Sequence, residues 1–124
     1  MALTLNLTLR NNRAQANIDE AGINAKLTVY TAAFASVLYT STCNATAFGT
    51  KAGGVLTANA IANATAGAGG IAAIARLFKT DGTTMVMEGL TVGTSGTNII
   101  ITNTTIAVND VVPTTSLTIT EGNP

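Results

Sequence analysis

The sequence contains no histidine, no tryptophan and only one cysteine, Cys43. Histidine is the commonest general base in enzymes, and without it Cys43 has no imidazole that would activate its thiol as a nucleophile. A single cysteine also excludes an internal disulfide framework. We therefore interpret Cys43 as a small buried hydrophobic residue, and the sequence predicts that the chain is not an enzyme.

Charged side chains are scarce as well, at 10% of the residues, and six basic groups balance six acidic ones. Nucleic-acid-binding domains normally carry a basic patch, so we expect no nucleic acid as a partner. The acidic residues are scattered and suggest neither a catalytic pair nor a calcium loop. The glycine-rich segments 67–70 and 93–96 match no phosphate loop or dinucleotide fingerprint. We expect no metal and no cofactor.

Long apolar runs are absent too, and no stretch is long enough to cross a bilayer. The first ten residues, MALTLNLTLR, lack a charged segment followed by a continuous apolar one. We therefore expect neither secretory export nor a membrane anchor. What remains is a neutral surface rich in threonine, asparagine and alanine, which is typical either of an ordinary soluble domain or of a protein that works in an assembly.

Threonine makes up roughly one residue in five, and its β-branched side chain favours extended backbone. Aromatic residues are only 4% of the chain, so the core must be aliphatic. Apolar segments recur at regular spacing, which predicts an all-β, jelly-roll-like β-sandwich of about eight strands in a single domain over residues 1–124. The predicted strands are residues 3–7, 25–31, 36–40, 55–61, 98–102 and 114–120, with two more in a central hairpin.

That hairpin is the clearest local signal, because two apolar runs meet at the Asp81-Gly82 step. Aspartate and glycine both accept the positive φ of a two-residue primed turn. Such a turn pairs Phe78 with Met85, Leu77 with Val86 and Arg76 with Met87. In this register Arg76 and Glu88 fall on opposite faces, and we expect no direct ion pair between them.

The N-terminal part combines a predicted strand with the one short predicted helix. Leu3, Leu5 and Leu7 alternate with polar residues, as in a half-buried strand or a clamp arm. The helix covers residues 8–22, where Thr8 is the N-cap and Gly22 supplies a left-handed stop.

Two later segments are predicted to be loops. Residues 40–54 are rich in turn-forming residues, with Phe48 as the one large anchor. Residues 63–70, NATAGAGG, are of low complexity and have nothing to bury, which indicates a mobile loop or one ordered by a partner.

Four blocks of the sequence resemble small proteins of tailed bacteriophages: LTLNLTLRNNRAQANIDEAG, AFGTKAGGVLTANAI, RLFKTDGTT and TSLTITEGN. Those proteins are capsid decoration, or cement, proteins. The resemblance implies a jelly-roll-like β-sandwich with a short helix, bound as an oligomer to the outside of an icosahedral shell. The implied partners are the major capsid protein and the chain itself, as a homodimer or homotrimer. The implied location is the outer capsid surface of the virion, after synthesis in the host cytoplasm.

A cement protein would bridge neighbouring capsid subunits, and a closed oligomer would present the same patch to symmetry-related sites. The candidate capsid or subunit contacts are Leu3, Leu5, Leu7, Phe48, Lys51, Asn63, Thr65 and Arg76. A tail or fibre component of the virion is the second hypothesis, because a threonine-rich β-domain fits there equally well. A carbohydrate-binding module is the third, but it needs exposed aromatic platforms. The side chains available for these are Tyr30, Phe34, Tyr39, Phe48 and Phe78, and several must fill the core.

Overall fold

The computed structural model describes residues 22–44, 48–52 and 55–120, together with Leu9, Asn12, Gln15, Ala16, Asp19 and Glu20. β-Strands make up 50% of the structure, which confirms the all-β class. Between residues 22 and 120, the described helical structure is the single 3-10 turn η1 (Ala32–Phe34). No helix among the described residues has the length and apolar character needed to span a membrane.

The strands follow one another with short connections. In chain order they are β1 (Lys26–Tyr30), β2 (Val37–Thr42), β3 (Phe48–Ala52), β4 (Val55–Ala58), β5 (Ala64–Thr65), β6 (Gly70–Ile71), β7 (Ile74–Phe78), β8 (Met85–Gly93), β9 (Ile99–Ile101), β10 (Thr105–Ile106), β11 (Val111–Val112) and β12 (Thr114–Thr120).

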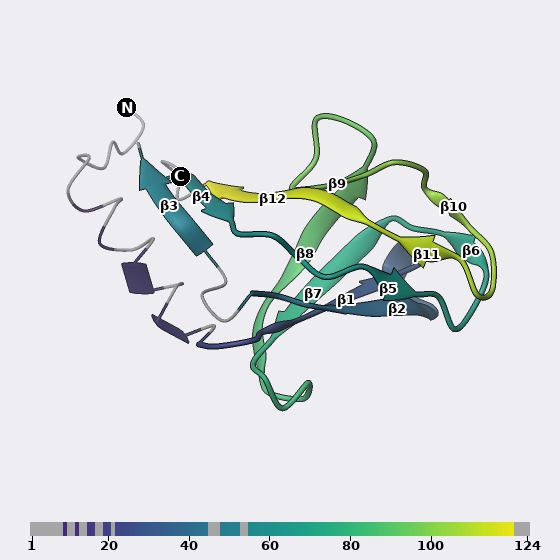
Figure 1. Cartoon of the computed structure of the whole chain (residues 1–124), viewed down its shortest axis with the longest axis horizontal. Helices are drawn as coiled ribbons and strands as arrows, with labels where there is room; N and C mark the ends of the chain where they lie inside the picture. The colour runs from purple at the N-terminus through teal and green to yellow at the C-terminus, as the bar shows by residue number, and fades with distance from the viewer. Residues whose placement is uncertain are drawn as a thin grey trace.

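Eight of these strands form one curled sheet in the order β2-β1-β7-β8-β9-β12-β4-β3 (Figure 1). Every neighbouring pair in it is antiparallel except β8 and β9, which are parallel. The sheet therefore divides into two antiparallel halves, β2-β1-β7-β8 and β9-β12-β4-β3, joined by a short parallel contact. A jelly roll also places two antiparallel sheets face to face, but the jelly-roll-like arrangement stays a prediction.

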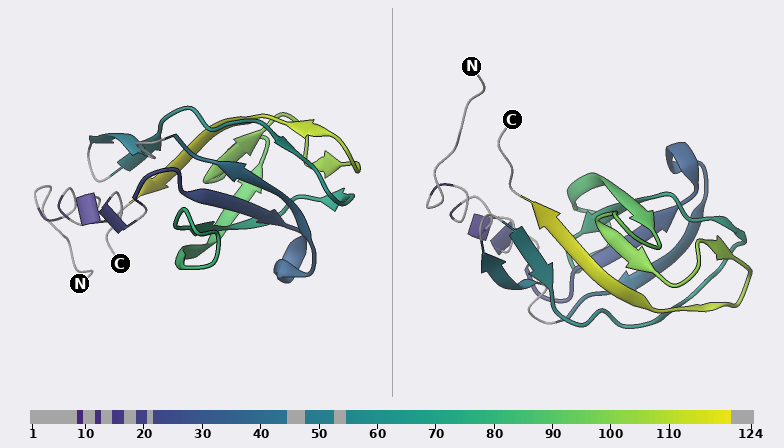
Figure 2. Two further views of the ribbon diagram at one scale, coloured as in Figure 1. Left: turned by 60° about the horizontal axis from the view of Figure 1, so that its bottom comes forward. Right: turned by 90° about the horizontal axis from the view of Figure 1, so that it is seen from above.

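The curled sheet is closed further by the chain that follows β4. The Ala62 amide donates to the Thr42 carbonyl at 3.1 Å, and the Gly67 amide donates to the Leu38 carbonyl at 3.0 Å. These bonds lie along the outer edge of β2 and satisfy part of an otherwise unpaired strand edge. The short pairs β5–β11 and β6–β10 gather at one end of the molecule, opposite the end that carries β3 (Figures 1 and 2).

The core lies on the concave side of the curled sheet and is mainly aliphatic, as the composition predicts. Along β7 and β9 alternate residues are buried, which is the pattern of a strand with one face in the core. The largest fully buried side chains include Leu27, Val29, Leu38, Leu56, Leu77, Ile99, Ile101 and Leu117. Two aromatic side chains, Tyr39 and Phe48, are each 2% exposed and complete the core.

The central hairpin forms, and β7 and β8 pair with Phe78 opposite Met85 as predicted. The predicted two-residue primed turn is wrong. The Lys79 amide donates to the Thr84 carbonyl, and the Gly82 amide donates to the Lys79 carbonyl, so the loop is longer than two residues. Gly82 has a φ of +73°, whereas Asp81 is not among the residues with positive φ. Asp81 instead uses its carboxylate to bind the amides of the loop.

Beyond Met85 the predicted register is also wrong, because β8 contains two irregularities. The pairing shifts between Leu77 and Phe78 and again between Ala75 and Arg76. A β-bulge adds one residue to one strand and moves every later residue along. Leu77 therefore lies opposite Met87, and Arg76 lies opposite Glu88. Contrary to the expectation, Arg76 and Glu88 share a face.

Neither of the two predicted loops is correct as stated. The segment 40–54 contains the end of β2 and the whole of β3, because Phe48 is buried and β3 pairs with β4. The segment 63–70 contains β5 and the start of β6, and its Ala64 and Ala66 are 7% and 1% exposed. Alanine is small enough to be buried where the chain passes close to β2, so this segment does have residues to bury.

The predicted N-terminal elements fall mostly outside the described residues. Residues 3–7 lie entirely outside them, and the predicted helix over residues 8–22 is described only at isolated positions. At six of these positions the backbone is helical. The Gln15 amide donates to the Asp19 carboxylate at 2.9 Å, four residues away, as on a helix. The N-terminal helix nevertheless stays a prediction.

Candidate functional site

The described residues offer little for catalysis or metal binding. No group of three or more histidine, cysteine, aspartate or glutamate residues comes together among them. Burial raises the pKa of Cys43 to about 11, although the charge of Lys26 lowers it slightly. A thiol with this pKa is almost entirely protonated at neutral pH and is a poor nucleophile. Two exposed surfaces are the candidate functional sites.

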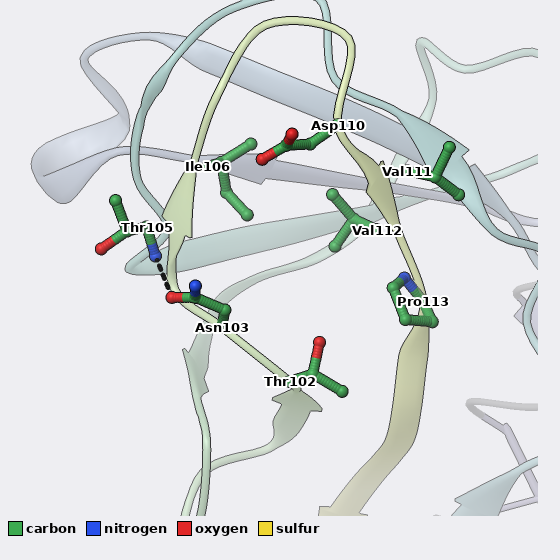
Figure 3. A pocket seen from close by; sticks show the side chains of 8 residues that line it. All are labelled: Thr102, Asn103, Thr105, Ile106, Asp110, Val111, Val112 and Pro113. Atoms are coloured by element: carbon green, nitrogen blue, oxygen red, sulfur yellow. Dashed lines mark hydrogen bonds between the residues drawn. The ribbon is translucent and has the colours of Figure 1, made fainter.

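The first surface, which we call the tip patch, consists of Ile71, Val108 and Val111. Their side chains are 63%, 56% and 63% exposed. They come from β6, the β10–β11 turn and β11, which meet at one end of the molecule (Figure 1). Exposed aliphatic side chains are a common feature of binding surfaces where they lie close together. Thr105, the cross-strand partner of Ile71, and Val111 point to opposite sides of this end (Figure 3), so the three residues share one end of the molecule and not one continuous face.

The tip patch is held in place by backbone hydrogen bonds. The Ala66 amide donates to the Asp110 carbonyl, and the Asn109 amide donates to the Ala66 carbonyl, both at 2.8 Å. Thr65 lies opposite Val111 in the β5–β11 pair, and both are exposed. The patch is thus presented by paired strands and needs little ordering when it binds, which favours affinity.

A hollow of about 70 Å³ opens beside the tip patch (Figure 3). Its lining residues are Thr102, Asn103, Thr105, Ile106, Asp110, Val111, Val112 and Pro113. Its two strongest polar groups are already engaged: Asn103 accepts from the Thr105 amide at 2.9 Å, and Asp110 accepts from the Ala107 amide at 2.8 Å. The hollow is much smaller than a typical cofactor site of roughly 300–1,000 Å³. It suits at most a single side chain of a partner.

The second surface is the outer face of the half-sheet β2-β1-β7-β8, which we call the outer sheet face. It is built from cross-strand rows of alternate residues. One row contains Thr40, Thr28, Arg76 and Glu88, and the next contains Thr42, Lys26, Phe78 and Met85. The Thr28 and Thr40 hydroxyls lie 3.2 Å apart, and Lys26 donates to the Thr42 hydroxyl at 2.9 Å.

Arg76 is the best-organised side chain on the outer sheet face. Its Nε lies 3.1 Å from Oε2 of Glu88. Its guanidinium carbon lies 4.0 Å from the ring centre of Phe34 and 5.2 Å from that of Tyr30. A hydrogen bond to Tyr30 raises the pKa of Arg76 more than the bond to Glu88 does, so the guanidinium remains charged. Stacking on aromatic rings and a carboxylate partner together fix its orientation.

Phe34 reaches Arg76 from an unusual backbone. Both Ala33 and Phe34 have positive φ, at 59° and 56°, within the 3-10 turn η1. Left-handed backbone costs about 1–2 kcal/mol for each residue other than glycine. The edge-to-face contact between Phe34 and Tyr30, with ring centres 5.3 Å apart, and the contact with Arg76 help to offset that cost.

The predicted contact residues do not form one site. Asn63 and Thr65 are exposed next to the tip patch, whereas Arg76 belongs to the outer sheet face. Phe48 was predicted to be a contact but is 2% exposed, so its side chain belongs to the core. Lys51 lies in β3, and its side chain is outside the described part of the chain, as are Leu3, Leu5 and Leu7.

Sequence inspection did not identify the tip patch or the role of Glu88. Val108 and Val111 flank the Asn109-Asp110 turn, and apolar residues beside a turn were the available signal. Their location at the same end of the molecule as Ile71 depends on strand pairs between distant segments, which no local pattern encodes. Glu88 reaches Arg76 only because of the shifts in β8.

Comparison with known proteins gives no relatives. No protein-family model matches the chain, and neither a curated protein nor a solved structure matches it significantly.

Proposed function

We propose that this chain is a structural virion protein that binds the outside of an icosahedral phage capsid and stabilises it by bridging neighbouring capsid subunits. The short sequence blocks that resemble decoration proteins support this assignment. So do the low charge of the chain and the lack of a metal-ligating cluster among the described residues. We also propose that the two antiparallel half-sheets form the jelly-roll-like sandwich that the resemblance implies.

The proposed mechanism is mass action. A protein that binds only the assembled shell stabilises the shell by its binding free energy. When one copy of this protein contacts two capsid subunits, separating the two subunits also requires breaking the contacts that at least one of them makes to this protein. A homodimer or homotrimer adds avidity, because each protomer binds an equivalent site on the lattice.

The observation that carries the proposal is the tip patch. Ile71, Val108 and Val111 present apolar surface from a framework of paired strands. Apolar contacts to the major capsid protein would be only weakly sensitive to salt, because they do not depend on screened charges. Asn63 and Thr65 lie beside this patch and would contribute polar contacts at its rim.

The test uses purified capsids that lack the protein. Ile71→Asp and Val111→Asp should reduce co-sedimentation with these capsids and should lower the rupture temperature of the decorated particles. Ile23→Asp is the matched control, because Ile23 is 65% exposed but precedes β1 and lies outside the tip patch. If decorated and bare shells rupture at the same temperature, the protein does not stabilise the capsid. Equal capsid binding by all three variants would show that the tip patch does not contact the capsid.

A tail or fibre component remains the second candidate. The copy number in purified virions separates the two functions, because decoration follows the surface lattice and tail parts do not. The structure gives the carbohydrate-binding alternative little support. Tyr30, Tyr39 and Phe48 are at most 8% exposed, so they form no aromatic platform.

A further inference from the structure

We propose that two copies of this chain pair through the outer sheet face, about a twofold axis that runs along the strands between β7 and β8. In this arrangement Arg76 of each protomer meets Glu88 of the other. The inference deepens the self-association named in the proposed function, since it specifies the surface and the symmetry. It does not depend on capsid binding.

The first argument is the arrangement of three cross-strand pairs on β7 and β8. Ile74 lies opposite Thr91, Arg76 opposite Glu88, and Phe78 opposite Met85. All six residues are half-buried or exposed. The inward-facing neighbours Ala75 and Leu77 are fully buried, which places the three pairs on the other side of the sheet.

The second argument is that these pairs complement themselves. A twofold axis lying between β7 and β8 exchanges the two strands, so each residue meets the partner of its own cross-strand pair. Arg76 then faces a carboxylate, and Phe78 faces the thioether of Met85, which is a favourable sulfur–aromatic contact. Ile74 meets Thr91, whose side chain carries a methyl group. The nearest charge across the interface to each Arg76 is therefore opposite in sign.

The third argument concerns the preparation of Arg76 and Glu88 for this contact. Their side chains are 31% and 49% exposed, so both can reach a second chain without leaving each other. The Phe34 ring stacked on the guanidinium holds it in one orientation. A charged pair with a fixed geometry loses less conformational entropy on binding than two free side chains would. Bidentate or bridged guanidinium–carboxylate contacts are also the strongest polar contacts at such interfaces.

The packing geometry and size of the face set the expected affinity. An axis along the strands keeps the strands of the two copies nearly parallel, as in aligned sheet packing. Five strand residues span about 16 Å, and the two strands β7 and β8, which overlap when the axis lies between them, cover about 10 Å. This face is smaller than the roughly 800 Å² per partner of a standard interface. We therefore expect a weak, reversible dimer that forms at high protein concentration, which avidity on a lattice would reinforce.

The experiment mixes two charge variants, Arg76→Glu and Glu88→Arg, and measures the molar mass by sedimentation equilibrium. Each variant alone loses the internal ion pair and places like charges across the twofold axis. Each should dimerise at least about tenfold more weakly than the wild type. In an equimolar mixture, opposite charges meet only between the two different chains. The mixture should therefore recover heterodimers with nearly wild-type affinity.

This design separates contacts within a chain from contacts between chains, because the internal pair is absent in every molecule of the mixture. Lys79→Glu is the control: Lys79 belongs to the same hairpin, pairs with Glu20 and should leave dimerisation unchanged. Thermal unfolding of each variant confirms that it is folded. A wild-type monomer at millimolar concentration, a trimer, or a mixture that stays monomeric would each overturn the proposal. If the monomeric variants still bind capsids, the decoration function stands without the dimer. If the wild type dimerises but does not bind capsids, the dimer stands without the decoration function.

Discussion

The carboxylate of Asp81 accepts two hydrogen bonds from Thr84, one from its hydroxyl at 2.5 Å and one from its amide at 2.8 Å. A third bond comes from the Thr83 amide at 2.8 Å. These bonds favour the charged carboxylate and lower the pKa of Asp81 to about 2, with the Thr84 hydroxyl making the largest contribution. The loop of the central hairpin is therefore organised around an ionised side chain.

This arrangement predicts an acid-sensitive contribution of Asp81 to stability. The folded-state pKa lies below the ordinary aspartate pKa of 3.8, so the contribution is present above about pH 4 and is lost as the pH falls towards 2. Urea unfolding between pH 7 and pH 2 should show this loss in the wild type. Asp81→Asn should be less stable at pH 7 and should lack that step. Thr84→Val, which keeps the carboxylate but removes its strongest donor, should shift the step to higher pH. An unchanged acid profile in Asp81→Asn would contradict the assignment.

The backbone conformation of Gly82 leads to a separate prediction about the stability of the same loop. Its φ is +73°, and a Cβ at this position would meet only the Lys26 side chain, at 3.9 Å. Space is therefore available, and the cost of a substitution comes from the backbone. Gly82→Val should destabilise the protein by about 1–2 kcal/mol, whereas Gly82→Asn should cost less because asparagine tolerates left-handed backbone. Equal unfolding midpoints for the two variants would show that the loop adopts another conformation.

The sequence was sufficient to predict much of the strand framework. Leu27 and Val29 alternate with polar residues, the run 99–101 is apolar throughout, and Pro113 directly precedes the final strand. These signals are local, because they follow from the two-residue repeat of a strand. The register of β8 was not predictable in the same way. This register depends on how β8 pairs with both β7 and the parallel β9. Gly89, with a φ of +81°, is the extra residue at one of the shifts between β7 and β8.

The candidate surfaces were harder still to predict. The tip patch forms only when β5 pairs with β11 and β6 pairs with β10. These strands lie far apart in the sequence, so local sequence patterns do not predict their pairing. The segment 63–70 looked featureless because its buried residues are alanines, whose burial depends on a close approach of β2. Arg76 was identified as a candidate contact, but its carboxylate partner followed only from the observed register.

Tyr39 provides a prediction in the alkaline range. Its hydroxyl is buried without a hydrogen-bond partner among the described residues, and desolvation raises its pKa to about 12. Because the pKa of Tyr39 is higher in the folded state than in the unfolded state, the contribution of its ionisation to the free energy of unfolding is fully present below pH 10. This contribution is lost as the pH rises towards 12. Tyr39→Phe removes the unpaired hydroxyl, so it should stabilise the protein by about 1 kcal/mol at pH 7 and flatten the alkaline loss. Denaturant unfolding from pH 7 to pH 12 measures both effects.

The matched control for Tyr39 is Tyr30→Phe. The Tyr30 hydroxyl interacts with Arg76, so removing it should not stabilise the fold. Cys43 also titrates in this range, with a pKa raised to about 11 by burial, and Cys43→Ala isolates its share. A Tyr39→Phe variant that is clearly less stable than the wild type at pH 7 would show that the hydroxyl has a partner in solution.

Phe48 distinguishes a core residue from a contact residue. Its side chain is 2% exposed and lies in the core cluster, where β3 pairs with β4. Phe48→Ala should therefore lower the free energy of unfolding by about 3–5 kcal/mol, through lost burial and the cavity that remains. Val111→Asp at the tip patch should change stability little, because Val111 is 63% exposed, while weakening capsid binding. Chemical unfolding and capsid co-sedimentation, measured on both variants, give opposite patterns for the two residues. If Phe48→Ala kept its stability and lost only binding, Phe48 would be a surface contact and the position of β3 in the sheet would be wrong.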